Sequence, residues 1–192
     1  MGLTGYKEYL DDNYNMSIFD KALKSDRPWL FHIHEDRVIN AKVAENFAYD
    51  VKLIVDGNNE EIMPKIQIKY LYPEDITDII PPLIKTDKKV RKFGISFIPS
   101  PANRYHILNK TLYALMKEKQ KVLFTLLEGE TFKGVTKDFS RFDINISLKG
   151  GVLVTIMRHS IFNLKDNKGR CFLKTFQKKH KDWQKSELYS DI

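Results

Sequence analysis

The sequence predicts a mainly β protein with short α-helices, organised as two small barrels of bent sheet, each with an N-terminal helix and five antiparallel strands. Three observations predict this fold class: an internal repeat, stretches in which apolar and polar residues alternate with period 2, and a set of prolines between the two copies of the repeat. The chain has 192 residues, of which 42% are hydrophobic, so it has enough apolar material for a folded core.

The internal repeat has an offset of 93 residues. The stretch AENFAYDVKLIVDG, residues 44–57, aligns with KDFSRFDINISLKG, residues 137–150, and Asp50 then falls on Asp143. The same offset continues on both sides of these stretches without a gap. A constant offset over this length predicts that one structural unit is written twice in the chain.

The second copy shows the predicted elements most clearly. Asn109 can cap a helix over KTLYALMKEK, and the stretch from 142 to 149 alternates apolar and polar residues, as a half-buried antiparallel strand does. Gly134, inside another strand, predicts the sharp bend by which a short sheet curls into a barrel. In the first copy, Ser17 is the predicted N-cap of the corresponding helix.

The connector between the copies is rich in proline, which cannot donate a hydrogen bond to a sheet ladder. Within it, VRKFGISFI at residues 90–98 alternates and predicts one further strand. The predicted segments are an N-terminal extension (1–16), a first domain (17–72), the connector (73–106), a second domain (107–165) and a basic C-terminal tail (166–192).

The net charge of +7 is unevenly distributed along the chain. Residues 1–82 carry −6, residues 83–121 carry +8, residues 122–164 carry +1 and residues 165–192 carry +4. A basic surplus of this kind permits a nucleic-acid partner.

Cysteine use and hydropathy indicate the compartment. Cys171 is the single cysteine, which excludes an intramolecular disulfide and a zinc site made of cysteines. No apolar run reaches the roughly 18 residues of a membrane span, and the first residues lack the apolar segment of a signal peptide. We therefore expect a cytoplasmic protein without a membrane anchor.

The sequence gives no indication of an enzyme. Adjacent carboxylates such as Glu60 and Glu61 point to different sides of a strand and cannot share a substrate, and no nucleophile elbow or phosphate loop is present. His32 and His34 share one face of a predicted strand, but they could hold a metal only if a third ligand converged on them. We expect no catalysis, no cofactor and no metal.

A helix followed by five short, bent strands resembles the plan of an Sm-like domain, and the second copy is similar to the bacterial Hfq branch of that family. The resemblance covers residues 107–164. The first copy, 17–72, is recognised as similar to the family chiefly because it aligns with the second copy. It is carried by LYALMKEK as the helix, VLFTLLEGETFKG as the first hairpin, FSRFDINISLKGG as the middle strands, and IMRHSIFNL in place of the family's Tyr-Lys-His-Ala-Ile signature.

The resemblance implies assembly into a ring. In Hfq six domains close a ring in which the fourth strand of one domain pairs with the fifth strand of the next. A chain with two such domains would complete a pseudo-hexameric ring as a homotrimer. The implied partner is short uridine-rich single-stranded RNA, in RNA-mediated regulation. The alternative is a structural ring that scaffolds a protein partner and has no RNA activity.

The resemblance also assigns roles to residues. In the second copy Phe142 is the aromatic on which a base stacks, Arg158 holds the position of a phosphate-binding lysine, and His159 is the histidine that reaches ribose or phosphate. Arg141 stands in place of a polar glutamine. These roles agree with the stacking of bases on aromatic side chains and the neutralisation of phosphate by cations.

The first copy departs from the family pattern and implies a weaker site. Tyr49 keeps the aromatic and Lys65 keeps the cation, but Ile66 replaces the histidine. The family's outer rim uses basic residues at the end of the helix, and the candidates for it here are Lys117, Lys119 and Lys121. A solvated helix end with cations favoured by the helix dipole explains these lysines equally well.

Overall fold

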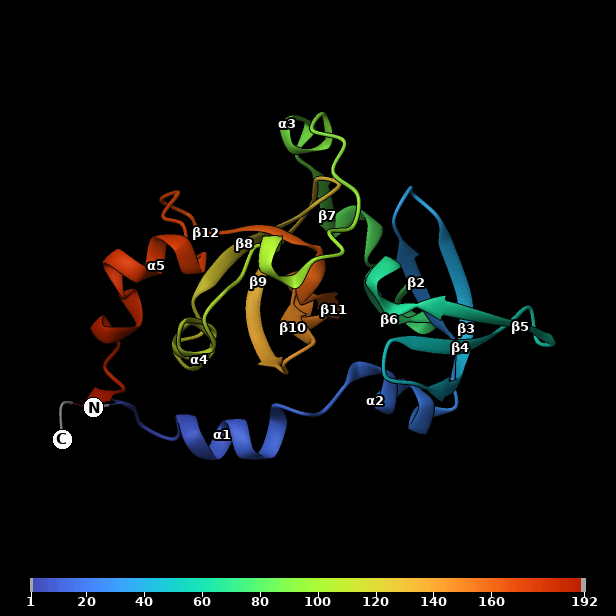
Figure 1. Ribbon diagram of the computed structural model, residues 1–192, viewed down its shortest axis with the longest axis horizontal. Helices are drawn as coiled ribbons and strands as arrows, with labels where there is room; N and C mark the ends of the chain where they lie inside the picture. The colour runs from blue at the N-terminus through green and yellow to red at the C-terminus, as the bar shows by residue number, and fades with distance from the viewer. Residues whose placement is uncertain (1, 191–192) are drawn as a thin grey trace.

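The computed structural model describes residues 2–190, and most of its strands belong to one antiparallel sheet of eleven strands (Figure 1). The first unit contains β2 (Trp29–Ile33), β3 (Val38–Asn46), β4 (Asp50–Val55), β5 (Asn59–Pro64) and β6 (Ile68–Pro73). The second unit contains β8 (Lys121–Leu126), β9 (Glu130–Phe139), β10 (Asp143–Ser147), β11 (Leu153–Met157) and β12 (Ile161–Asp166).

The prediction of two small barrels joined by a connector is wrong. The strand order is β12-β8-β9-β10-β11-β6-β2-β3-β4-β5, so the two units are consecutive parts of one sheet, and this sheet is not closed. In each unit the fifth strand pairs with the first: β6 pairs with β2, and β12 pairs with β8. The two units are joined where β11, the fourth strand of the second unit, pairs with β6, the fifth strand of the first. We call this junction the seam. At the seam, the backbone groups on the edge of each unit pair with the other unit, so neither unit closes on itself.

The strand register of the first unit recurs in the second unit 93 residues later. Trp29 pairs with Ala41 between β2 and β3, and Val122 pairs with Gly134 between β8 and β9. The register also shifts at corresponding points of β3 and β9. Because a slip of one residue turns every side chain to the opposite face, the shared register buries equivalent positions in the two units.

A helix precedes each unit. α2 (Ile18–Ser25) begins after Ser17, whose hydroxyl accepts a hydrogen bond from the Phe19 amide at 3.2 Å. α4 (Asn109–Lys117) begins at Asn109 itself, so the predicted cap is one residue out of place; the Asn109 side chain instead accepts from Arg158. Within the described residues no helix combines the length and the apolar character that crossing a membrane requires.

The terminal segments pack against the second unit. α1 (Tyr6–Asn13) runs along it toward α2 (Figure 1). The Tyr9 hydroxyl donates to the Phe139 carbonyl and accepts from the Phe139 amide. β1 (Gly2–Leu3) pairs with β13 (Tyr189–Ser190), and α5 (Lys174–His180) precedes β13 in the tail. Residues 1, 191 and 192 of the predicted extension and tail lie outside the described residues.

The predicted strand at residues 90–98 is also wrong. The connector contributes β7 (Ile84–Thr86), which pairs with β9, followed by the short helix α3 (Lys88–Arg91). The helix forms here because the Asp87 carboxylate accepts hydrogen bonds from the first free amides of the turn, those of Lys89 and Val90.

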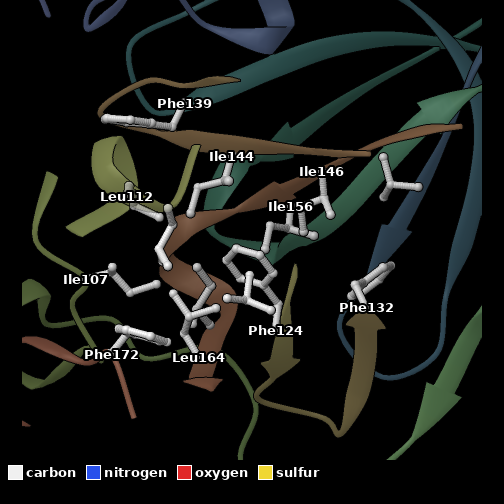
Figure 2. Close-up of a cluster of buried hydrophobic side chains, with 14 of the residues drawn as sticks. Ile107, Leu112, Phe124, Phe132, Phe139, Ile144, Ile146, Ile156, Leu164 and Phe172 are labelled. Carbon is white, nitrogen blue, oxygen red and sulfur yellow. The ribbon is translucent and has the colours of Figure 1, made fainter. Parts of the chain in front are cut away.

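The hydrophobic core of each unit extends across the seam. Tyr70 and Tyr72 of β6 belong to the core of the second unit, and Met157 of β11 belongs to the core of the first. The two units are therefore held together by packing as well as by strand pairing. Figure 2 shows the side chains that fill the larger core, among them Phe124, Phe132, Ile144, Ile146, Ile156 and Leu164.

Candidate functional site

A pocket of about 830 Å³ opens at the seam. Its lining comes from both units, from the linker between α1 and α2, and from the connector. All six residues predicted for RNA binding line it: Phe142, Arg141, Arg158, His159, Tyr49 and Lys65. The three candidate rim residues, Lys117, Lys119 and Lys121, lie elsewhere, at the end of α4 and the start of β8.

The same local geometry brings an aromatic residue next to a cation in each unit. A one-turn 3₁₀ helix joins the fourth strand to the fifth, and its first residue is Arg158 in the second unit and Lys65 in the first. The Arg158 amide donates to the Phe142 carbonyl at 2.9 Å, and the Lys65 amide donates to the Tyr49 carbonyl at 2.9 Å. The repeat therefore provides the pocket with two related sets of functional groups.

The two aromatic side chains are accessible to a ligand. Phe142 is 41% exposed and Tyr49 is 84% exposed. Alternation alone predicts that Phe142 belongs to the core, but it precedes the first residue of β10 and remains partly exposed. The guanidinium carbon of Arg141 lies 5.1 Å from the centroid of the Phe142 ring, so a cation is held beside the stacking surface.

Arg158 is largely committed to the framework. Its guanidinium donates to the Asn109 side chain at 2.9 Å, to the Ser140 carbonyl at 2.9 Å and to the Ile107 carbonyl at 2.8 Å. Burial lowers the pKa of Arg158, but a guanidinium stays charged in proteins. Arg158 therefore contributes positive charge to the pocket, with few donors left for a ligand.

His159 connects the two units. Its Nε2 lies 2.9 Å from the Ile68 carbonyl, across the seam. Because a carbonyl can only accept, Nε2 carries the proton and Nδ1 is the acceptor. Burial lowers the pKa of His159 to about 4, so the ring is neutral at pH 7. A neutral ring cannot neutralise phosphate, but its Nδ1 can accept from a hydroxyl or an N–H group.

Lys65, the cation of the first unit, is also engaged by the protein. Its ammonium donates to the Phe47 carbonyl and lies 5.2 Å from the centroid of the Phe19 ring. Burial lowers the pKa of Lys65, whereas the nearby carboxylates of Asp20 and Asp50 act in the opposite direction. Both carboxylates line the pocket, so this half of it is less favourable for a phosphate.

Some pocket residues escaped the sequence analysis because they lie outside the repeat. Arg104 and His106 come from the connector, and Tyr14 comes from the linker before α2. Arg104 donates through Nε and Nη2 to the carbonyls of Ile98 and Pro99, which fixes its guanidinium beside the pocket. The basic surplus of residues 83–121 was the sequence feature that could have indicated a cationic pocket residue in the connector, but only tertiary packing brings Arg104 to this site.

His32 and His34 have separate partners. His32 stacks on Tyr70 with 4.1 Å between ring centroids, and burial lowers the pKa of His32 to about 4. His34 lies 3.0 Å from Glu128 through Nδ1. Carboxylate oxygens of Asp36, Glu128 and Glu130 lie within 4.8 Å of one another, but the ammonium of Lys69 pairs with both glutamates. Asp36 pairs with Arg91, so each carboxylate of this cluster already has a cationic partner within the protein.

Comparison with known proteins gives no family assignment: no protein-family model matches the chain, and no curated protein matches it. The functional argument therefore depends on the residues that the seam brings together. They are exposed aromatics beside cations, with a neutral histidine as a hydrogen-bond acceptor, in one pocket.

Proposed function

We propose that this chain is an Sm-like, Hfq-type protein that binds short uridine-rich single-stranded RNA in the seam pocket. The observation that carries the proposal is the pair of exposed aromatics, Phe142 and Tyr49, in one pocket with Arg141, Arg158 and Lys65. Aromatic side chains stack on bases of single strands and contribute about 1–3 kcal/mol per base. Phe142 and Tyr49 are the residues on which two bases would stack.

Cations supply the second part of the recognition. Arg141 and Arg104 line the pocket beside Arg158, and each phosphate that they neutralise releases counterions. The affinity should therefore fall as salt is raised. His159 gives the pocket an acceptor through Nδ1, which suits a 2′-hydroxyl or the N3–H of uracil better than a phosphate.

We also propose that three chains close a ring with alternating units, and that the protein is cytoplasmic. The assembly is supported by the end strand β5, whose outer edge has no partner strand in the described part of the chain; at the other end of the sheet, residues 170–172 cover part of the outer edge of β12. Such edges template pairing with another chain. Ile62 on β5 is 64% exposed, an apolar side chain that pairing would cover. Residues 1–82 carry a net charge of −6 and the rest of the chain is positively charged, which also favours head-to-tail association.

The experiment is fluorescence anisotropy with a labelled hexauridine across a salt series. We expect salt-sensitive binding that Phe142→Ala weakens about tenfold or more, because a stacking surface is lost. Phe176→Ala is the matched control, since Phe176 is a half-exposed phenylalanine on α5, outside the pocket. Equal affinity of the wild type and Phe142→Ala would contradict the proposed site.

The same experiment distinguishes an RNA-binding protein from a structural ring that scaffolds a protein partner. A folded, assembled protein that binds neither uridine-rich nor mixed-sequence single strands would contradict the RNA proposal. That result would favour the structural ring with a protein partner, because the strand edges would still serve assembly.

A further inference from the structure

The seam pocket has two sides with opposite hydrogen-bonding character. One side, formed by the second unit and the connector, carries three cations: Arg104, Arg141 and Arg158. The other side, formed by the first unit, carries three side chains with acceptor oxygens: Asp20, Asn46 and Asp50. We call them the cationic side and the acceptor side. Single-stranded RNA offers both phosphates and base edges, so the two sides suit different parts of one ligand.

The carboxylate of Asp50 lacks the partners that its counterpart in the repeat has. Asp143 is buried, and its carboxylate accepts from the Ile18 amide at 2.9 Å and from the Ser140 hydroxyl at 2.9 Å. Asp50 is only half-buried, and the counterpart of Ser140 in the first unit is Phe47, which has no hydroxyl. Within residues 2–190 the Phe47 amide donates to the backbone carbonyl of Asp50, but no donor reaches its carboxylate.

A second acceptor of this side also lacks a partner. The Nδ2 of Asn46 donates to Oδ1 of Asp20 at 2.6 Å. Because a carboxylate can only accept, the amide nitrogen faces Asp20 and the amide oxygen is left over. This oxygen, Asn46 Oδ1, is buried and has no hydrogen-bond partner in the described part of the chain. Buried polar groups are normally hydrogen-bonded, so a donor from outside the chain is needed here.

The cation of the first unit does not compensate the acceptor side. The Lys65 ammonium donates to the Phe47 carbonyl and lies over the Phe19 ring. The carboxylates of Asp20 and Asp50 oppose the effect of burial on the pKa of Lys65, so they lie near its ammonium, but neither forms an ion pair with it among the described residues. The acceptor side therefore repels a phosphate and attracts N–H donors.

The four bases differ in the donors that they offer to such a side. Tyr49, 84% exposed, lies in the turn before β4, and the next residue is Asp50. Guanine has two adjacent donors on one edge, N1–H and the 2-amino group, which match the two oxygens of a carboxylate. Uracil has one N–H between two carbonyl oxygens, which a carboxylate repels. Adenine and cytosine each have one amino group beside an acceptor nitrogen.

We propose that Tyr49 and Asp50 form a guanine subsite at the acceptor side of the seam pocket, so that the preferred ligand is a uridine-rich strand with one guanosine. The guanine ring stacks on Tyr49 and donates to the Asp50 carboxylate, a uracil stacks on Phe142, and the phosphates lie toward the cationic side. This inference rests on the RNA binding proposed above, and it does not depend on how many chains assemble.

The first test uses the wild-type protein and fluorescence anisotropy. Six labelled hexamers each carry one guanosine, at successive positions of hexauridine. One or two of them should bind about tenfold more tightly than hexauridine, because two donors meet a charged acceptor. Adenosine at the same position tests purine stacking, and inosine keeps N1–H but lacks the 2-amino group. Both should lose most of the gain. An equal gain for adenosine, or the same gain at every position, would overturn the inference.

The second test removes the carboxylate. Asp50→Asn keeps the size of the side chain but loses its charge and one acceptor oxygen, so the preference for the guanosine strand over hexauridine should fall from about tenfold to about twofold or less. Asp56→Asn is the matched control, because it makes the same change at an exposed aspartate of the first unit outside the pocket. If Asp50→Asn strengthens every strand by the same factor and leaves the preference unchanged, the carboxylate only repels phosphate and the inference is wrong.

The outcomes separate this inference from the proposed function. Hexauridine that binds in the seam pocket without any preference for guanosine overturns the inference and leaves the RNA proposal in place. Failure of all the hexamers to bind contradicts both. The wild-type series needs no variant, so it decides the question even where Asp50→Asn folds poorly.

Discussion

The residues of the pocket divide into those that hold the framework and those that face a ligand. Arg158 donates a hydrogen bond to Asn109 of α4, and His159 donates one to the Ile68 carbonyl. Tyr49 is 84% exposed and Phe142 is 41% exposed, so both rings remain accessible. The family resemblance assigns all four to RNA, but it cannot tell which of them also stabilises the fold. That distinction comes from partners that are distant in sequence.

This division gives a prediction for paired variants. His159→Ala should lower the free energy of unfolding by about 1–3 kcal/mol, because it removes a hydrogen bond and leaves a carbonyl at the seam without that partner. Phe142→Ala should leave the free energy of unfolding within about 0.5 kcal/mol of the wild type, because the ring is partly exposed. Urea unfolding followed by circular dichroism measures both. Equal stability of the two variants would contradict the framework role of His159.

Asp143 gives a prediction about pH. Burial raises the pKa of Asp143 to about 6, although the carboxylate accepts from the Ile18 amide and the Ser140 hydroxyl. The folded protein thus holds this proton more tightly than the unfolded chain does. The contribution of Asp143 to stability is present at low pH and is lost as the pH rises from about 4 to about 6.

The measurement is the free energy of unfolding at several pH values for the wild type and Asp143→Asn. His32 and His159, whose pKa values are lowered to about 4, act in the opposite direction in both proteins. The difference between wild type and variant removes their effect, and it should fall by about 3 kcal/mol from pH 4 to pH 7. A flat difference would show that Asp143 titrates normally.

At the scale of elements, most strands of the two units could be predicted because alternation is a local signal. The alternation from residue 142 to 149 predicts a half-buried strand, but Asp143 and Asn145 on its predicted polar face are buried together with Ile144 and Ile146. The strand predicted at residues 90–98 failed because alternation alone does not provide a partner edge, whereas β7 finds one on β9. Arg104 and Tyr14 could not be assigned to the pocket, since neither the connector nor the linker repeats.

Gly134 gives a prediction at the scale of one element. A Cβ at this position would clash with the Ser147 carbonyl oxygen on the neighbouring strand β10. Gly134→Ala should therefore destabilise the protein by about 1–3 kcal/mol, as overpacking does. The counterpart in the repeat, Ala41, already carries a Cβ, so Ala41→Gly should cost only about 1 kcal/mol. Thermal unfolding compares the two, and a harmless Gly134→Ala would contradict the close approach of β9 and β10.

At the scale of the molecule, the main departure from the sequence prediction is the continuous sheet. Alternation shows that a strand has a buried face, but it does not show whether the strand's edge pairs within its own unit or with another unit. The pairing of β11 with β6 satisfies one edge from each unit inside the chain. The outer edge of β5 remains at one end of the sheet, and at the other end residues 170–172 cover part of the outer edge of β12.

This arrangement predicts the mass of the assembly. Each chain has a mass of 22.5 kDa, so three chains would give about 68 kDa by light scattering. Ile62→Lys should lower that mass, because it adds a charge to an apolar position on an edge strand. Ile79→Lys is the control, since Ile79 is an exposed isoleucine outside the strands. A monomer for the wild type would contradict the ring.

The measurement that tests the central claim most directly is the site of RNA crosslinking. A hexauridine carrying one 4-thiouridine would be irradiated on the assembled protein, and the adducts would be mapped by mass spectrometry. The account predicts adducts on the peptides that contain Phe142 and Tyr49, and their loss in Phe142→Ala and Tyr49→Ala. Adducts confined to the basic tail, or their persistence in both variants, would contradict the assignment of the seam pocket as the RNA site.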